Sequence, residues 1–309
     1  GKGGGVYVES TGQLSISGDA KITGNKSDGD KTSNIYLSSD SAKITLGGAL
    51  TGGNQFGVTR DSLGPLTVGF GDYMPDANVE DYFVCENPDY YLGEVGAGSS
   101  REVTVLTDDN ALNWSYAVKM SLAQNGAQWT VKLTGDWNAD PDSVYYSKSF
   151  GPDSLPGYSN GALYVPEGAN IVLDLNGFTV DRGLKKDGVL TSARTNGYVI
   201  HVGGKFRLED NSTSGTGIVT GGWNQTASRA GGVYIAVGGE FTQAGGNITE
   251  NESTGTASAG GVYVGGTFTM IGGSVTNNIG AYGGVYIPAE SEFNVGGSLE
   301  IYDNKKADD

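Results

Sequence analysis

The chain has 309 residues, of which 53 are glycine and 17% are charged, and it carries a formal net charge of −16. This glycine content argues against an ordinary helical or α/β domain and indicates a chain with many turns. The negative charge repels phosphate groups, so nucleic acids and anionic lipid surfaces are disfavoured as partners. No segment approaches the roughly 20 apolar residues of a membrane-spanning helix, and no membrane insertion is expected.

Residues 1–60 open with the pattern GGVYV at positions 4–8 and continue with NIYL at positions 34–37. Alternating apolar residues after a glycine pair are typical of short strands that follow tight turns. The same pattern returns near the C-terminus. Residues 1–60 are therefore predicted to form terminal coils of a repetitive β structure.

Residues 61–106 lack this cadence and are rich in Tyr, Asp, Pro and Gly. Such a composition is typical of loops and turns. The segment is predicted to be an irregular connector or a small subdomain.

One helix is predicted, from Asp109 to Gly126. Asp108 or Asp109 would be the N-cap, and the sequence Asn125-Gly126 would end the helix. Its apolar face would consist of Ala111, Trp114, Val118 and Leu122. Because a stack of strands needs a lid over its first coil, this helix is expected to be a cap, followed by strands at 129–133 and 171–175.

Residues 107–309 are predicted to be the main repetitive domain. The patterns GGVYI, GGVYV and GGVYI begin at residues 231, 260 and 283, at intervals of 29 and 23 residues, which is the period of a solenoid. Within one repeat, Val262/Val264, Phe268/Met270 and Val275 mark three short apolar alternations separated by glycine pairs. The prediction is an all-β fold, a parallel β-helix with three short strands per coil and a rise of about 4.8 Å per turn.

Four asparagines end the third strand of successive repeats: Asn25, Asn251, Asn278 and Asn304. Asparagine tolerates left-handed backbone angles, and its amide can bond the neighbouring coil. A structural turn ladder is therefore favoured over ligand binding.

The cadence GG-V-Y-V, G-x-F-x-M and GG-x-[IV]-T-x-N resembles the β-helical repeat regions of large bacterial surface and adhesin-like proteins, within the broad pectate-lyase-like superfamily. The resemblance covers about residues 161–309 and 4–50. It implies a right-handed parallel β-helix at an extracellular or bacterial cell-surface location, with a structural or adhesive function.

A longer period relates the two ends of the chain. Residues 4–30 align without a gap onto residues 283–309, at an offset of 279 that pairs Tyr7 with Tyr286, Ile22 with Ile301 and Asn25 with Asn304. Two interpretations stay open: the chain is a window on a tandem protein with adjacent modules, or its N-terminal coils stack end to end on the last coil of another copy, which could build a filament. A third alternative is that residues 1–60 fold back on their own chain.

A column of tyrosines is expected where the middle of the first strand faces outward: Tyr164, Tyr234, Tyr263 and Tyr286. Such a column could stack surface glycans, but stacked like residues also stabilise a solenoid by themselves. The lone histidine, His201, aligns with Ala236 and is expected to be an ordinary surface residue, while Cys85 is expected to be a buried thiol.

No catalytic residue and no metal site are expected. The alternative function is a polysaccharide lyase or hydrolase, for which Asp174, Asp181 and Asp210 are the candidate acids. These acids are scattered in sequence, so solvated surface carboxylates are favoured. No cofactor is expected, and calcium in the acidic turns stays an open alternative.

Overall fold

The computed structural model describes residues 3–96, 98–139, 156–186, 189–190 and 197–307. The chain divides into two compact units, Gly1–Asp108 and Asp109–Asp309. Each unit is described separately below as the N-terminal unit and the C-terminal unit. Both consist mainly of β-strands, as the sequence predicts.

The C-terminal unit contains three sheets of parallel strands. We name them the tyrosine sheet, the long sheet and the short sheet. The tyrosine sheet comprises β13 (Tyr158–Ser159), β14 (Ala162–Val165), β19 (Ile200–Val202), β23 (Val233–Ile235), β27 (Val262–Val264) and β30 (Val285–Tyr286). The long sheet comprises β11 (Gln128–Lys132), β12 (Trp137–Asn138), β15 (Asn170–Asp174), β16 (Thr179–Asp181), β20 (Lys205–Glu209), β21 (Ile218–Thr220), β24 (Glu240–Gln243), β25 (Asn247–Thr249), β28 (Thr267–Thr276) and β31 (Glu292–Tyr302). The short sheet comprises β22 (Trp223–Asn224), β26 (Glu252–Ser253), β29 (Ile279–Gly280) and β32 (Lys305–Lys306).

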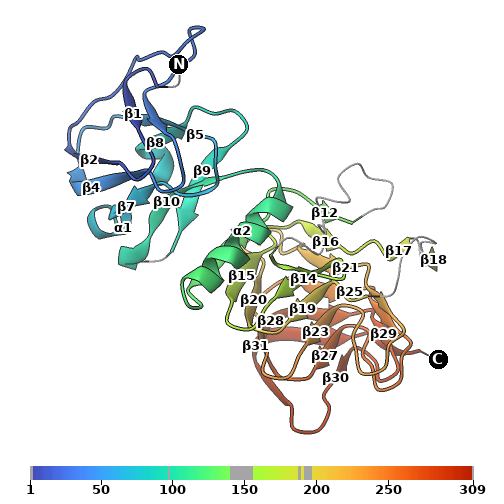
Figure 1. Cartoon of the computed structure of the whole chain (residues 1–309). Helices are drawn as coiled ribbons and strands as arrows, with labels where there is room; N and C mark the ends of the chain where they lie inside the picture. Colours follow the sequence, from blue (N-terminus) through green and yellow to red (C-terminus); the bar gives the residue numbers. More distant parts are fainter. Residues whose placement is uncertain (1–2, 97, 140–155, 187–188, 191–196, 308–309) are drawn as a thin grey trace. The chain divides into compact units, whose positions relative to one another are not determined.

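Successive repeats pair in parallel and in register, as the recurring GGVY motifs predict. Val233 pairs with Val262, and Val262 pairs with Val285. In Figure 1, β14, β19, β23, β27 and β30 follow one another from yellow-green to red along this sheet. The two-residue strands of the short sheet are a further segment of each repeat that the sequence did not predict.

Antiparallel pairs also occur in this unit, one of them at the edge of the tyrosine sheet. β13 pairs antiparallel with β14, and β17 (Lys185–Lys186) pairs antiparallel with β18 (Val189–Leu190).

Like side chains stack in the interior of the C-terminal unit. Phe206, Phe241, Phe268 and Phe293 form a column with ring centroids 5.4, 4.9 and 4.8 Å apart. Val275 is fully buried at the position that pairs with Ile301 of the last repeat. Burial of such aliphatic and aromatic side chains is the main stabilising contribution to the unit.

The predicted helix is present as α2 (Asn110–Ala123), and the Asp109 side chain accepts hydrogen bonds from the backbone N–H groups of Ala111 and Leu112 at 3.0 and 3.2 Å. The helix packs against β11 and β15 at the start of the strand stack. Trp114 is fully buried, and its indole lies edge-on to Phe206 at 6.2 Å. Leu122, expected on the buried face, is 43% exposed.

The N-terminal unit also has parallel sheets, with strand orders β1-β3-β5-β8 and β2-β4-β7, and an antiparallel sheet β6-β10-β9. Its strands are β1 (Val6–Val8), β2 (Gln13–Gly18), β3 (Ile35–Leu37), β4 (Lys43–Leu50), β5 (Phe56–Arg60), β6 (Gly64–Pro65), β7 (Thr67–Val68), β8 (Phe83–Cys85), β9 (Tyr91–Val95) and β10 (Glu102–Leu106). Its helical turns are α1 (Phe70–Tyr73), η1 (Val79–Asp81) and η2 (Gly98–Ser100).

Residues 61–106 are not an irregular connector. They add strands to the sheets begun by residues 1–60, and the two segments share one core. The physical reason is apolar burial: Leu66, Phe70, Phe83 and Val103 are almost completely buried against residues such as Ile35. These apolar residues lack the glycine-marked spacing of the repeats, so no periodic pattern in the sequence predicts that they are buried.

Among the described residues, no helix combines the length and the apolar character needed to cross a membrane.

Candidate functional site

An asparagine ladder runs through the C-terminal unit. The backbone N–H of Asn251 donates to Oδ1 of Asn278 at 3.0 Å, and the backbone N–H of Asn278 donates to Oδ1 of Asn304 at 3.0 Å. The side-chain amides repeat the same step, with Nδ2 of Asn278 at 3.0 Å from Oδ1 of Asn304. Each step therefore has one direction, from a donor in the earlier repeat to an acceptor in the later one.

The second glycine of each GGVY motif makes room for this ladder. A Cβ at Gly261 would lie 2.7 Å from the carbonyl oxygen of Gly284 and 3.0 Å from Nδ2 of Asn278. Gly284 has the same relation to Asn304. The glycine and the asparagine of one repeat are thus parts of one packing unit, although they lie 17 and 20 residues apart in the sequence at Gly261–Asn278 and Gly284–Asn304.

One expectation about the ladder needs correction. The left-handed backbone angle belongs to the residue before each asparagine, at Glu250, Asn277 and Asp303, with φ of 57°, 53° and 52°. The ladder asparagine keeps a negative φ, which lets its amide reach the adjacent strand.

Asn25 lies in the N-terminal unit, and there it makes the equivalent ladder step to Asn34. Its backbone N–H and its Nδ2 donate to Oδ1 of Asn34 at 3.0 and 3.2 Å. Asn34 in turn donates to the carboxylate of Glu86 at 2.6 and 2.9 Å.

An aromatic column follows the tyrosine sheet. The neighbouring ring centroids of Tyr164, His201, Tyr234, Tyr263 and Tyr286 lie 4.8, 5.2, 5.4 and 5.7 Å apart. The structure brings all four predicted tyrosines together. It also places His201 among them, because His201 pairs with Tyr234 and not with Ala236 as the sequence alignment assumed.

His201 is half-buried between rings and is not an ordinary surface histidine. Burial, together with the positive charge of Arg229, lowers its pKa to about 4. Arg229 lies 4.5 Å above the Tyr234 ring, a cation–π contact, and donates to the Tyr234 hydroxyl at 3.2 Å. The imidazole is therefore neutral at pH 7.

The ring faces of the column are largely covered by one another. Tyr198 stacks on Tyr234 at 5.4 Å with 17° between the planes, and Tyr282 stacks on Tyr286 at 4.8 Å. A sugar that binds by stacking needs a free ring face. This packing favours stabilisation of the repeats over glycan stacking as the role of the column.

The candidate catalytic acids are engaged in turns. Asp174 is buried and accepts hydrogen bonds from the backbone N–H groups of Asn176 and Asn211, both at 3.0 Å. Burial by itself would raise the pKa of Asp210, but hydrogen bonds from the Ser212 hydroxyl and from backbone N–H groups outweigh it and lower the pKa. Asp181 accepts from the backbone N–H of Gly183 at 2.8 Å. This is the arrangement of turn-forming carboxylates.

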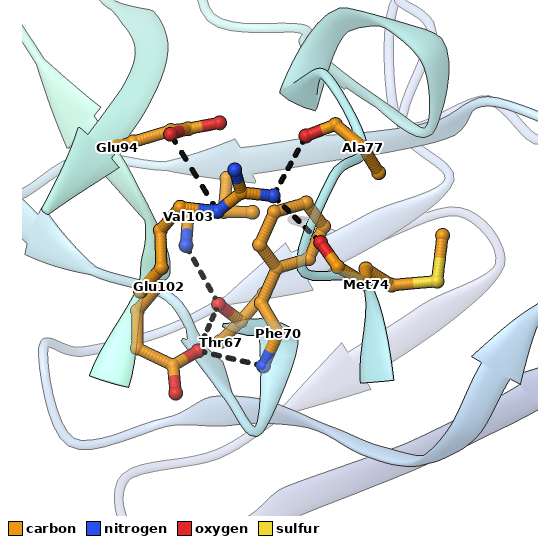
Figure 2. Close-up of polar contacts among 8 residues, drawn as sticks. Thr67, Phe70, Met74, Ala77, Glu94, Glu102 and Val103 are labelled. Carbon is orange, nitrogen blue, oxygen red and sulfur yellow. Dashed lines mark hydrogen bonds and ion pairs between the residues drawn. The ribbon is translucent and has the colours of Figure 1, made fainter. Parts of the chain in front are cut away.

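The N-terminal unit has its own polar cluster (Figure 2). Glu102 accepts hydrogen bonds from the Phe70 backbone N–H at the start of α1 at 3.1 Å and from the Thr67 hydroxyl at 2.6 Å. It also accepts one from the backbone N–H of Gly69 at 2.7 Å. Arg101 donates to the carbonyl oxygens of Met74 and Ala77 at 2.6 and 2.7 Å. These charges hold the ends of a four-residue helix in place, so the cluster is structural.

Cys85 is half-buried, and burial raises the pKa of its thiol, which makes it a poor nucleophile at neutral pH.

A groove of about 680 Å³ crosses several repeats of the C-terminal unit. Its lining includes Asp181, Lys185, Glu250, Asn277, Asp303 and Lys305. Lys185 forms an ion pair with Glu252 at the edge of this groove. The volume is typical of small-ligand sites, and the lining is polar.

The last repeat of the C-terminal unit is open on one side. We call residues 283–307, with β30, β31 and β32, the C-terminal repeat; each of these strands pairs with only one neighbour. Val295 is 64% exposed, whereas Met270, its partner in the preceding repeat, is fully buried. Ile301 is 41% exposed, whereas Val275 is fully buried.

The first repeat of the N-terminal unit lies at the opposite edge of its sheets, where the strand order begins. We call residues 4–30 the N-terminal repeat; its strands β1 and β2 end their sheets and pair only with β3 and β4. Tyr7 is half-exposed, and Val6, Leu14 and Ile22 are partly buried against the core of that unit.

Within the described residues, no group of three or more His, Cys, Asp or Glu side chains is arranged to hold a metal ion. Comparison of the chain with protein-family models, with curated proteins and with solved structures finds no match.

Proposed function

We propose that the chain is a structural or adhesive module of the bacterial cell surface, a right-handed parallel β-helix whose ends are extended by further coils. Three features support the proposal: in-register parallel pairing, columns of like side chains, and an open last repeat. The observation that carries it is the contrast in exposure between Ile301 and Val275, two paired positions of adjacent repeats. An apolar row left open at the end of a parallel sheet is a surface that a further strand can cover.

The polar chemistry of the chain supports a structural role over polysaccharide cleavage. The candidate acids Asp174 and Asp210 are occupied by backbone N–H groups, and the aromatic rings cover one another. Both arrangements stabilise turns and repeats.

Electron microscopy and sedimentation of the purified full chain test the proposal. Filaments or end-to-end oligomers that grow with concentration are expected, together with slower amide hydrogen exchange in β31 as its open edge becomes paired. A single monomeric species at every concentration, with unprotected β31 amides, would contradict end-to-end extension.

A second candidate function is glycan recognition, which the polar groove favours. Hydroxyl groups of a sugar can bond the carboxylates and ammonium groups that line it, such as Asp181 and Lys185. Binding to a glycan array that is lost on Lys185→Ala and kept on Lys132→Ala, an exposed position outside the groove, would support this function. Binding that both variants keep, or that both variants lose, would count against the groove as a glycan site.

A further inference from the structure

We infer that the surface that covers the C-terminal repeat is the N-terminal repeat of a second copy of this chain, stacked at the offset of 279 that relates the two repeats. The inference rests on the proposed function and specifies its partner and register. Like residues stack on like residues from one repeat to the next within the C-terminal unit, as Phe268 on Phe293 and Asn278 on Asn304 show. The N-terminal repeat carries the same residue types in the same phase, including Asn25 at the position of Asn304.

The asparagine ladder has complementary ends. Its direction runs from a backbone N–H in one repeat to Oδ1 in the next, at Asn251 to Asn278, Asn278 to Asn304, and Asn25 to Asn34. In the part of the chain that the structure describes, the backbone N–H of Asn304 has no acceptor and Oδ1 of Asn25 has no donor. One bond from Asn304 to the partner's Asn25 continues the ladder without a break.

Backbone groups follow the same geometry on both sides of the junction. The N–H of Val262 donates to the carbonyl of Gly284 at 2.8 Å, and the N–H of Val6 donates to the carbonyl of Asn34 at 2.9 Å. By the same rule, the N–H of Val285 would donate to the carbonyl of the partner's Gly5. Both units thus stack successive repeats with one hydrogen-bond pattern, so the end of one unit matches the start of the other.

Apolar and charged side chains agree with this register. At this offset the exposed Val295 and Ile301 would lie opposite the partner's Ile16 and Ile22. Ile16 is already buried and Ile22 partly buried in their own unit, so the gain in burial falls on Val295 and Ile301.

One pair of opposite charges also supports this register, because Glu300 of the C-terminal repeat would lie opposite the partner's Lys21. Lys305 would face the partner's Lys26, which has the same charge. Within its own chain, Lys26 forms an ion pair with Asp30, with 2.9 Å between Nζ and Oδ1, and this pair offsets the repulsion.

Disulfide trapping tests the register. Two chains, both carrying Cys85→Ser, are mixed under oxidising conditions, one with Glu300→Cys and the other with Lys21→Cys. In a parallel continuation at this offset, Glu300 of β31 would lie directly opposite Lys21, which follows β2. Directly opposed positions lie within the roughly 4.4–6.8 Å between Cα atoms that a disulfide needs, so a linked heterodimer is expected at about ten times the yield of the control pair. The control pair combines Lys21→Cys with Glu292→Cys, which lies eight positions away along β31.

Charge reversal provides an independent test. Glu300→Lys is expected to weaken association about tenfold by opposing two lysines, and the double change Glu300→Lys with Lys21→Glu in one chain is expected to restore it. Glu167→Lys, at an exposed position away from the junction, is the control for net charge and is expected to associate as the unmodified chain does.

The outcomes separate this inference from the proposed function. Concentration-dependent assembly with equal trapping of both cysteine pairs, or without rescue by the double charge reversal, overturns the 279-residue register alone. A strictly monomeric chain overturns end-to-end extension as well.

Discussion

Replacement of Asn278 by alanine is expected to destabilise the C-terminal unit by about 3–4 kcal/mol. Asn278 is fully buried, and its side chain accepts two hydrogen bonds from Asn251 and donates to the carbonyls of Ile248 and Thr276 and to Oδ1 of Asn304. Each bond contributes about 1 kcal/mol net, and the backbone N–H of Asn251 would remain buried without a partner. The two Nδ2 protons are shared among three acceptors and bonds of one network are not additive, so the loss is smaller than the sum of about 5 kcal/mol for five separate bonds.

Urea unfolding followed by tryptophan fluorescence measures this effect. All four tryptophans, Trp114, Trp129, Trp137 and Trp223, belong to the C-terminal unit, so their fluorescence reports on that unit alone. The matched control is Asn277→Gly, which removes the neighbouring exposed amide and keeps a left-handed backbone conformation without strain. A loss below about 1 kcal/mol for Asn278→Ala, or an equal loss for the control, would refute a stabilising role of the ladder.

Three further changes test other parts of the structure. Gly261→Ala is expected to lower the midpoint of thermal unfolding, because its Cβ would lie 2.7 Å from a carbonyl oxygen, whereas Gly296→Ala, with no atom within 4 Å of the new Cβ, is expected to leave it unchanged; equal midpoints would disprove the close packing. Because the folded state lowers the pKa of His201 from 6.5 to about 4, the unfolded chain binds the proton more readily, and stability should fall as the pH is lowered from above 6.5 toward 4. The loss should be about 1–2 kcal/mol, since the ring keeps partial solvent contact, and His201→Tyr should remove it; an unchanged pH profile in that variant would assign the dependence to other groups. Trp114→Ala is expected to cost about 3–5 kcal/mol in urea unfolding followed by circular dichroism, because the indole fills the start of the interior under α2, and a cost below 1 kcal/mol would remove the helix from its capping role.

Much of the C-terminal unit could be predicted from the sequence because its information is local and repeated. A glycine pair, a period-two apolar alternation and a constant phase place Val233, Val262 and Val285 in equivalent positions. Parallel pairing of equivalent positions then follows, and the structure shows it. The helix near residue 110 was predictable for a similar reason. The N-cap aspartate directly precedes the helical segment, and the Asn-Gly sequence that ends it follows shortly after.

Loop lengths limited the prediction of the earlier repeats. The alignment assigned His201 to the position of Ala236, but the strands pair two residues away, at Tyr234. A shift of two residues preserves the alternation of strand faces, so apolar periodicity cannot detect it. Contact with Tyr164 on one side and Tyr234 on the other determines the register in the folded chain.

Residues 61–106 show the other limit of sequence reasoning. Their strands join the sheets of residues 1–60 through contacts between positions far apart in the chain, such as Phe56 with Phe83. No glycine pair or repeated motif marks these strands, so their composition resembles that of a loop.

Repeated local patterns made the strand-rich repeats, their phase and the relation between residues 4–30 and 283–309 predictable from the sequence. Which polar groups are engaged is a feature of the folded chain: Asp174 and Asp210 accept hydrogen bonds in turns, the asparagine ladder runs in one direction, and Ile301 lies uncovered. Those outcomes depend on which strand lies beside which, and that is a property of long-range packing.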